Sequence, residues 1–307
     1  IIILDEEHDI SFKQQDGLRY HARDVAMVRA KNTNVPIVLG TATPSLESWH
    51  NANRKDNKYN FLKLTNRAIK NAILPKIQTV LVNDKTKYGI SRLLVDAISD
   101  RLKRKEQSLI YINRRGFAPV LFCSNCSWYS ECTRCSSKLV IHSKINKLKC
   151  HHCGYEKELI SQCPTCNSVD LRPLGSGTQK IEKVLKEFFP KASILRVDRD
   201  TTRSKKSLSL LYERMNNRDI DILVGTQMLA KGHDFPFLTL VGVLDADNAL
   251  YSPDYRASER LFSQLMQVSG RAGRSNIKGE VFIQTAFPNN PVFEAIKKHN
   301  YESFVQI

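Results

Sequence analysis

A run of aliphatic residues leads directly into a cluster of ionisable side chains in the stretch IIILDEEHD. The pattern predicts a buried strand whose carboxyl end carries Asp5, Glu6, Glu7 and His8. In a nucleotide hydrolase this is the acidic half of the ATP site, with one carboxylate for magnesium and one for the attacking water. The phosphate-cradling half is a G-x-x-x-x-G-K-[ST] loop, and none occurs in the 307 residues. We therefore expect either a chance acidic cluster or a chain that lacks its beginning.

The second group of chemically informative residues is a set of eight cysteines within 123–166, arranged as four C-x-x-C pairs. The pairs are Cys123–Cys126, Cys132–Cys135, Cys150–Cys153 and Cys163–Cys166. Two such pairs grip one tetrahedral zinc ion, so four pairs predict two closed sites that hold shape and do no chemistry. Disulfides fit the even count, but the sequence shows no secretory signal and a reducing cytosol opposes them. Spacing alone leaves open which pairs share an ion.

Other side chains near the cysteines have two interpretations. Trp128 and Tyr129 are either a stacking platform for a base or the small core of a module with little else to bury. We favour the core. Eight cysteines already supply four ligands to each of two ions, so the neighbouring histidines are not needed as ligands. We expect them to face solvent or nucleic acid. They are His142, His151 and His152.

The composition is that of a globular protein with a basic balance. Hydrophobic residues make up 41% of the chain, and no apolar run approaches the roughly 20 residues that a membrane span needs. The formal net charge is +16, which favours a polyanionic partner such as nucleic acid. Positive residues concentrate in 101–105, 142–152 and 195–206. Each run alone is equally well explained as a solvated surface.

Outside the cysteine block, strand-like apolar runs alternate with helical ones. Strands are expected at IIILD, VPIVLG, SLIYIN, SILRV, DILVG, LTLVGVLDA and EVFIQT, with helices at HARDVAMVRAKN, QKIEKVLKEFF, LSLLYERMNN, ERLFSQLMQV and from about Leu46. Continuous apolar strands separated by helices indicate a parallel α/β sheet covered on both faces. The cysteine block is then an insertion into this α/β unit, and 74–91 is a linker between two such units.

Four short motifs follow predicted strands or end a helix, where open α/β sheets place ligands. They are GTATPS (40–45), GSGT (175–178), GTQMLAKGHDF (225–235) and QVSGRAGR (267–274). Each is weak alone. Their order after the acidic strand end resembles that of superfamily 2 helicases. Together with INRRGFAP, DRDTT and the eight cysteines, the chain resembles the primosomal protein N′ family, the PriA-type replication-restart helicases of bacteria.

The resemblance implies RecA-like helicase lobes, a partial first lobe and a complete second lobe, with an inserted two-zinc Cys-rich module. In this family the phosphate loop precedes the DEEH residues, so the chain is expected to be a fragment that cannot hydrolyse ATP alone. The implied domains are 1–73 (first lobe), 74–91 (linker), 92–121 (start of the second lobe), 122–172 (zinc insertion), 173–286 (rest of the second lobe) and 287–307 (start of a C-terminal domain). The resemblance also implies nested zinc sites, Cys123/Cys126/Cys163/Cys166 and Cys132/Cys135/Cys150/Cys153.

When the family's roles are carried over to the matching motif positions, Asp5 is expected to hold magnesium, Glu6 to activate water and His8 to relay the nucleotide state. Thr41 and Thr43 couple hydrolysis to lobe closure, and Arg271 and Arg274 face the triphosphate. The remaining implied ATP contacts are Gly232, Asp234 and Gln267. The implied DNA contacts are Phe12, Arg19, Tyr20, Arg114, Arg115, Thr226, Gln227 and Lys231. One departure is Leu18, which stands where the family's aromatic-rich loop has Trp, so coupling of DNA binding to hydrolysis is expected to be weaker.

The implied activity is ATP-dependent 3′-to-5′ unwinding of DNA at stalled forks in the bacterial cytoplasm. The implied partners are forked and single-stranded DNA, single-strand DNA-binding protein and primosome loading proteins, with no membrane. Two alternatives stay open. One is another superfamily 2 translocase, acting on RNA or duplex DNA, against which the cysteine insertion argues. The other is a basic zinc module that binds DNA without catalysis.

Overall fold

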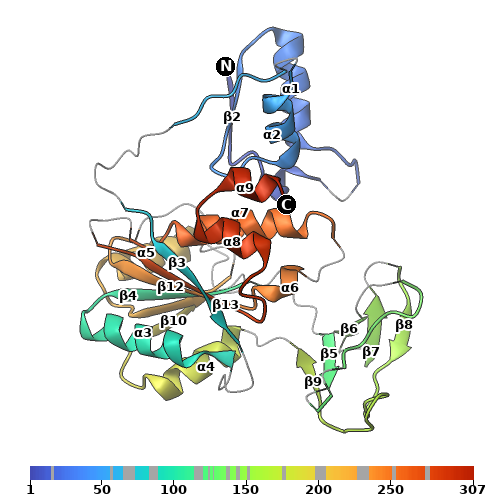
Figure 1. Cartoon of the computed structure of the whole chain (residues 1–307), viewed down its shortest axis with the longest axis vertical. Coiled ribbons are helices and arrows are strands. Elements are labelled where there is room, and N and C mark those ends of the chain that lie inside the picture. The colour runs from blue at the N-terminus through green and yellow to red at the C-terminus, as the bar shows by residue number, and fades with distance from the viewer. Residues whose placement is uncertain are drawn as a thin grey trace. The chain divides into compact units, whose positions relative to one another are not determined.

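The structure is a computed structural model in which the chain divides into two compact units (Figure 1). Unit 1 comprises Ile1–Lys70 and His299–Ile307, and unit 2 comprises Asn71–Lys298. The residues that the structure describes are 1–14, 17–55, 58–64, 73–82, 89–113, 120–123, 125–126, 128–135, 139–142, 146–150, 153–174, 178–197, 205–226, 235–250, 254–273 and 277–307. No helix among them is long and apolar enough to cross a membrane.

Unit 1 is built on two parallel strands, β1 (Ile2–Asp5) and β2 (Ile37–Gly40). Asp5 lies opposite Gly40 in the register, so both strands end at the same edge. The other elements are the 3₁₀ turn η1 (Ile10–Phe12) and the helices α1 (Ala22–Thr33), α2 (Leu46–Asn53) and α9 (Tyr301–Val305). Helix α1 contacts both strands and stops at Asn34, which adopts the left-handed conformation common at helix ends. The parallel pairing therefore brings the DEEH and TATPS turns together.

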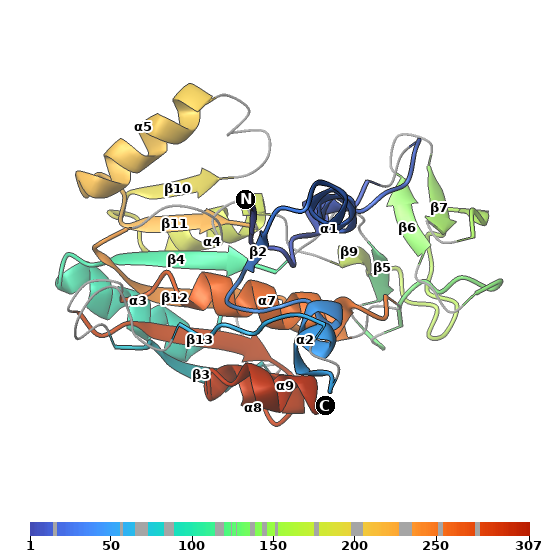
Figure 2. The same cartoon turned by 90° about the horizontal axis from the view of Figure 1, so that it is seen from above.

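Unit 2 contains a six-stranded sheet in which every pairing is parallel (Figure 2). Its strands are, in spatial order, β10 (Ile194–Val197), β11 (Ile222–Gly225), β4 (Gln107–Ile112), β12 (Leu238–Leu244), β13 (Glu280–Thr285) and β3 (Lys76–Leu81). The two central strands, β4 and β12, are buried at every position. Burial on both faces explains their largely apolar sequence and confirms the predicted parallel α/β sheet.

Helices cover both faces of this sheet. Figure 1 shows α3 and α4 on one side, and α7 and α8 on the other. The bounds of the helices in this unit are α3 (Arg92–Lys103), α4 (Thr178–Phe188), α5 (Lys205–Asn216), α6 (Asp247–Leu250), α7 (Ala257–Ser269) and α8 (Pro291–Lys297). Leu94 and Ile98 of α3 and Leu185 of α4 join an apolar cluster that includes Ile110 and Val224 of the sheet. Every strand and helix expected outside the cysteine block is present.

The cysteine block forms a separate antiparallel sheet of five strands, ordered β8-β7-β6-β5-β9. The strands are β5 (Val120–Cys123), β6 (Leu139–His142), β7 (Lys147–Cys150), β8 (Glu156–Glu158) and β9 (Leu171–Leu174). They stand in the sequence between β4 and α4, as the insertion prediction requires. Trp128 packs against the small apolar core of this sheet, which agrees with the structural interpretation of that residue, whereas Tyr129 is exposed.

Two expected boundaries differ from the structure. The segment 74–91, expected to be a linker, contains β3, which pairs with β13 as the edge strand of the large sheet. Its half-exposed burial pattern explains why its mixed polar sequence does not look like a core strand. The residues expected to begin a C-terminal domain, 287–307, are shared between the units. Helix α8 contacts β3 and α7 in unit 2, and α9 belongs to unit 1.

Candidate nucleotide site and cysteine centres

The acidic turn after β1 presents two accessible carboxylates at the carboxyl edge of the strand. Asp5 is exposed, and the side chain of Glu6 is 43% exposed. Glu6 adopts a left-handed backbone conformation (φ 51°) and donates its N–H to Asp5 Oδ1 at 3.0 Å. The chain therefore reverses at Glu6. Glu7 N then donates to Gly40 O at 3.2 Å, which fastens the turn to the end of β2.

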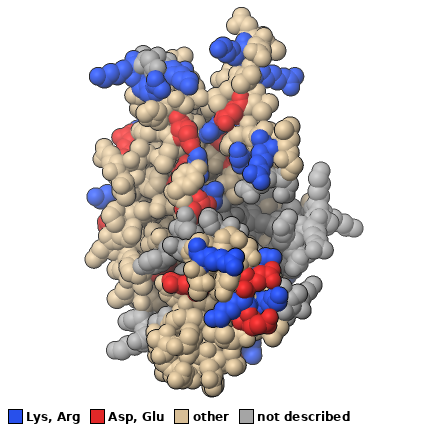
Figure 3. Space-filling view, turned by 90° about the vertical axis from the view of Figure 1, so that its right-hand side faces the viewer, with Lys and Arg blue, Asp and Glu red and all other residues tan. Residues whose placement is uncertain are grey.

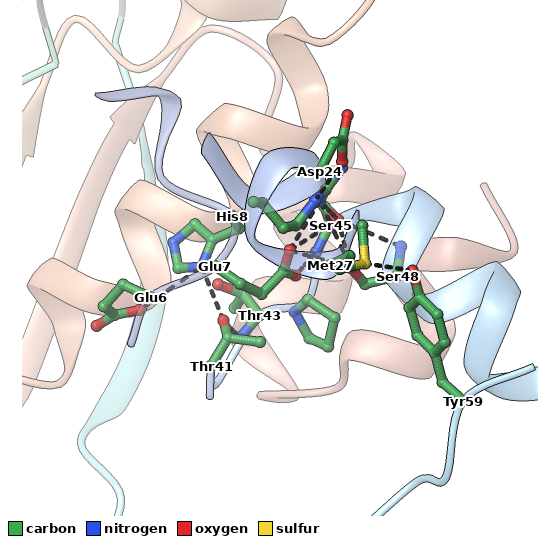
Figure 4. Close-up of polar contacts among 12 residues, drawn as sticks. Glu6, Glu7, His8, Asp24, Met27, Thr41, Thr43, Ser45, Ser48 and Tyr59 are labelled. Carbon is green, nitrogen blue, oxygen red and sulfur yellow. Dashed lines mark hydrogen bonds and ion pairs between the residues drawn. The ribbon is translucent and has the colours of Figure 1, made fainter. Parts of the chain in front are cut away.

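The structure brings His8 and the TATPS turn into direct contact (Figure 4). His8 Nδ1 lies 2.7 Å from Thr41 Oγ1 and 3.5 Å from Glu6 Oε2. Thr41 Oγ1 also accepts the backbone N–H of Thr43 at 3.0 Å. An imidazole that touches both an acid of the first turn and a hydroxyl of the second is placed to link the two turns. The predicted roles of these residues stay predictions, but their proximity is an observation.

Sequence reasoning missed the most buried polar group of this region, the carboxylate of Glu7. Its side chain is 0% exposed and accepts a hydrogen bond from Arg23 Nη1 at 2.8 Å. Ser45 donates its backbone N–H at 2.6 Å and its hydroxyl at 3.1 Å, and the Ser48 hydroxyl donates at 3.0 Å. Figure 4 shows Glu7 among Ser45, Ser48 and its other partners. Glu7 thereby joins β1, α1 and α2.

Arg23 is itself buried, with 9% of its side chain exposed. Burial acts to lower the pKa of its guanidinium, but the hydrogen bond and charge of Glu7 outweigh burial and leave that pKa raised. Two signals for this pair are visible in the sequence. Arg23 is a charged residue in the first turn of a predicted helix, where cations are unfavourable. Ser45 and Ser48 flank the start of the next predicted helix, as capping residues do.

The loop between the acidic turn and α1 carries three of the predicted DNA contacts. Its ends meet in an antiparallel bridge between Lys13 and His21, and Gln14 N donates to Tyr20 O at 2.9 Å. Arg19 and Tyr20 are exposed, and Phe12 in η1 is half-buried. The bridge fixes the base of the loop and leaves Arg19 and Tyr20 accessible. Their contact with DNA stays a prediction.

Of the second-lobe residues, Thr226 follows β11, Gln267 lies in the last turn of α7 and Arg271 follows that helix. Arg271 is buried, at 7% exposure, and its charge acts on the Tyr212 phenol, whose pKa burial nevertheless raises. The nucleotide role of Arg271 stays a prediction. Several predicted site residues lie outside the described residues, and so do His151, His152 and most of GSGT. These site residues are Arg114, Arg115, Gln227, Lys231, Gly232, Asp234 and Arg274.

The glycines of the QVSGRAGR motif could be explained by close approach of a ligand. For Gly273, however, the packing of the chain itself explains why a glycine is required. It has a φ of +69°, and a Cβ added there would lie 2.4 Å from the backbone N of Gly279. The two glycines allow the turn after α7 to cross the chain that enters β13. Close approach of backbone to backbone accounts for Gly273 without a ligand.

The eight cysteines form two groups of four, and their membership is the nested one that the resemblance implied. In the first group, Sγ–Sγ distances are 3.6 Å for Cys123–Cys166 and for Cys126–Cys163. In the second group, the corresponding distances are 3.5 Å for Cys132–Cys153 and for Cys135–Cys150. A tetrahedral zinc ion with bonds of about 2.3 Å separates its sulfur ligands by roughly 3.8 Å. The geometry of both groups fits such an ion.

The thiol pKa values of the first group show what a cation would supply. A hydrogen bond from the backbone N–H of Ser168, helped by the Asn125 side chain, lowers the pKa of Cys166 to about 6. The backbone N–H of Trp128 acts to lower the pKa of Cys126, yet burial and the neighbouring sulfurs raise it to about 12. Four adjacent sulfurs do not all ionise at neutral pH without a positive charge among them. A divalent metal provides that charge.

The predicted basic runs are largely paired where the structure describes them. Arg101 donates to Glu280, and Arg196 to Glu182 at 3.1 Å. Lys149 and Lys147 lie 2.9 and 3.2 Å from Glu156, and their hydrogen bonds lower the pKa of that carboxyl. Figure 3 shows basic side chains in separate clusters, with acidic ones between them, on the face in view. These described runs therefore add little to the case for nucleic acid.

Comparisons with known proteins agree with the cysteine geometry and with the fold. Residues 132–157 match the family model of the PriA DNA helicase Cys-rich region domain. The sequence is 44% identical to the replication restart protein PriA of Haemophilus influenzae, over 99% of this chain and 42% of that protein. It is 39% identical to PriA of Bacillus subtilis, over 100% of this chain and 38% of that protein.

The chain belongs to the PriA family of replication restart proteins. It spans less than half the length of these two relatives of the PriA family. A solved structure of Mss116p bound to ssRNA and AMP-PNP has a TM-score of 0.51 to this chain, at 15% identity, and covers 96% of this chain and 45% of its own. This likeness concerns the fold alone. RecA-like helicase lobes with an inserted cysteine-rich module are thus the architecture of this PriA family chain.

Replacing Arg23 with Ala should destabilise unit 1 by about 3–5 kcal/mol, because it leaves the Glu7 carboxylate buried without its cation. The matched control is Arg92→Ala, which breaks an exposed i,i+4 pair with Asp96 and should cost about 0.5 kcal/mol or less. Urea unfolding followed by circular dichroism measures the cost of both variants. Equal costs for the two variants would contradict a stabilising role for the pair.

Gly273→Ala should destabilise unit 2 well beyond the cost of a left-handed alanine, which is about 1 kcal/mol. Gly89→Ala is the control, because Gly89 also has a positive φ (+82°) but nothing lies within 4 Å of its added Cβ. Thermal unfolding followed by circular dichroism compares the two. If both variants lose the same stability, the backbone crossing at Gly279 is not what requires Gly273.

Proposed function

We propose that this chain is the catalytic and zinc-binding part of an ATP-dependent 3′-to-5′ DNA helicase that acts at stalled forks and starts primosome assembly. The observation that carries the proposal is the meeting of the DEEH and TATPS turns in a chain of the PriA family. In this proposal, ATP binds at the carboxyl edge of β1 and β2. The DNA contacts are the exposed residues of the loop that follows the acidic turn.

Within that site, Asp5 would hold magnesium through water, and Glu6 would orient and deprotonate the attacking water. Asp5 is exposed and Glu6 is partly exposed at the end of a strand, which suits a hydrated cation. The ion, when bound, offsets charge that develops on the transferring phosphoryl group. His8 would report the state of Glu6 to Thr41. Arg271 and Arg274 would approach from unit 2 and contribute about 10³–10⁵ in rate, as arginine fingers do.

The lysine and hydroxyl that grip the phosphates are not among these 307 residues, since no phosphate loop occurs in the sequence. We infer that such a loop is supplied by further residues of the same protein and that this chain alone hydrolyses no ATP. The exposed face of the small sheet supports this inference. Ile3 and Val38 are 67% and 44% exposed there, an apolar face that further residues of the protein would cover.

Each cysteine group would hold one zinc ion, as the sulfur distances support. All eight ligands are thiolates, so the sites would be closed and structural. The partners proposed for the whole protein are single-strand DNA-binding protein and primosome loading proteins, in the bacterial cytoplasm. They rest on the family, and no surface of the described residues is assigned to them.

A second candidate function is a zinc-bearing DNA-binding module without catalysis. The preformed cysteine groups favour it for the chain taken by itself. The two functions differ in a simple measurement, because a binding module retards forked DNA but hydrolyses nothing, with or without a phosphate loop. Stimulation by RNA as well as by forked DNA would instead indicate another superfamily 2 translocase.

A protein that carries these residues together with a phosphate loop should hydrolyse ATP when forked DNA is added. Glu6→Gln should lower kcat by about 10²–10⁴-fold, the range for loss of a general base. Glu187→Gln, on the exposed face of α4, is the control and should leave kcat unchanged. A phosphate-release assay measures both variants and the 307-residue chain, for which no turnover is expected. Turnover by that chain, or equal rates for the two variants, would contradict the proposed site.

Zinc analysis should find two ions per chain, and Cys153→Ser should reduce the count to one, because only its group of four loses a ligand. Chelation should expose 123–166 to proteases, since coordination supplies much of the stability of so small a core. Mass spectrometry of bound metal and of proteolytic fragments gives both readouts, and Ser130→Ala, which removes no ligand, is the control. Unchanged proteolysis after complete chelation would rule out a structural role for zinc.

A further inference from the structure

The end of the chain passes from unit 2 into unit 1 between Lys298 and His299. Helix α8 contacts α7 and β3 in unit 2, and α9 belongs to unit 1. Lys298 is the C-cap of α8 and Asn300 is the N-cap of α9, with its side chain accepting from Ser303 N. His299 is the one residue between the two caps, in a left-handed conformation with φ 50°.

Helix α9 is held in unit 1 by aromatic packing. The ring centroid of Tyr301 lies 5.2 Å from that of Trp49 on α2, with the planes at 70°. Phe61 approaches the other side of Trp49 at 5.6 Å and 79°. Phe304, next on the same face of α9, is buried and lies 6.0 Å from Tyr301. Edge-to-face pairs of this kind add to the burial of apolar area, so α9 is an integral part of unit 1.

The hydroxyl of Tyr301 reaches the TATPS turn, where it donates a hydrogen bond to Pro44 O. The residues on either side of Pro44 are held by the acidic turn. Thr43 N donates to Thr41 Oγ1, which contacts His8, and Ser45 N donates to Glu7. Tyr301 thus fixes the middle of this turn, although it lies 257 residues after Pro44 in the sequence.

We propose that Tyr301 is a positioning residue of the TATPS turn: by holding Pro44 it keeps Thr41 in contact with His8. The proposal rests on the proposed ATP site.

The contact itself is tested on the 307-residue chain labelled with 5-fluorotryptophan. The chain has two tryptophans, so fluorine NMR should give one signal for Trp49 and one for Trp128, which serves as an internal reference. Tyr301→Ala should shift the Trp49 signal and leave that of Trp128 in place. Tyr301→Phe keeps the ring and should nearly preserve both signals. An unmoved Trp49 signal in Tyr301→Ala would overturn the packing of α9, whatever the enzyme does.

The positioning role is tested in the longer protein with its phosphate loop. Tyr301→Phe should lower DNA-stimulated kcat about three- to tenfold, the effect of one hydrogen bond, and leave KM for ATP within about twofold. The exposed Tyr255, changed to Phe, is the control. A purely structural role would lower the melting temperature without this separation of kcat from KM. An active wild type with an unchanged Tyr301→Phe kcat would overturn the proposal, whereas an inactive wild type would contradict the proposed function.

Discussion

The buried carboxylate of Glu7 is the interaction on which the candidate nucleotide site depends. Transferring a charge from water to a protein interior costs several kcal/mol, and only a matched cation and further donors offset it. Arg23 supplies the charge, and Ser45 and Ser48 supply the remaining donors. Glu7 follows β1, and its partners come from α1 and the start of α2, so these three elements cannot separate without leaving a charge unpaired. Because the buried ion pair of Glu7 and Arg23 is energetically costly to break, it holds the candidate site in place.

The burial of Glu7 also explains why this carboxylate and those of Asp5 and Glu6 lie in different environments. Glu7 is directed inward, and Glu6 and Asp5 remain accessible at the strand edge. The left-handed conformation of Glu6 makes the division possible, because it turns the chain sharply between consecutive residues. A non-glycine residue in that conformation costs about 1 kcal/mol or more. The several hydrogen bonds of Glu7 outweigh that cost, so a structural carboxylate holds the proposed catalytic one in place.

The sequence predicted what depends on local patterns. Apolar runs identified the strands of the large sheet, and C-x-x-C spacing identified the cysteines as ligands. The nested grouping came from family resemblance, because spacing is compatible with other pairings. The edge strand β3 was taken for a linker, since one exposed side removes the continuous apolar signal. Arg23 and Tyr301 were missed for a different reason. Their partners lie 16 and 257 residues away, and no local periodicity encodes such contacts.

The nested grouping has a physical reason in the topology of the insertion. Strands β5 and β9, which enter and leave the cysteine module, are paired with each other, and Cys123 lies opposite Leu171. The entrance and exit are therefore adjacent, so the module can be inserted without changing the spacing of β4 and α4. The first and last cysteine pairs meet at this stem, and the two inner pairs meet farther into the module. Zinc in the outer group would close the stem, and zinc in the inner group would hold the hairpin of β6 and β7 to the chain before it.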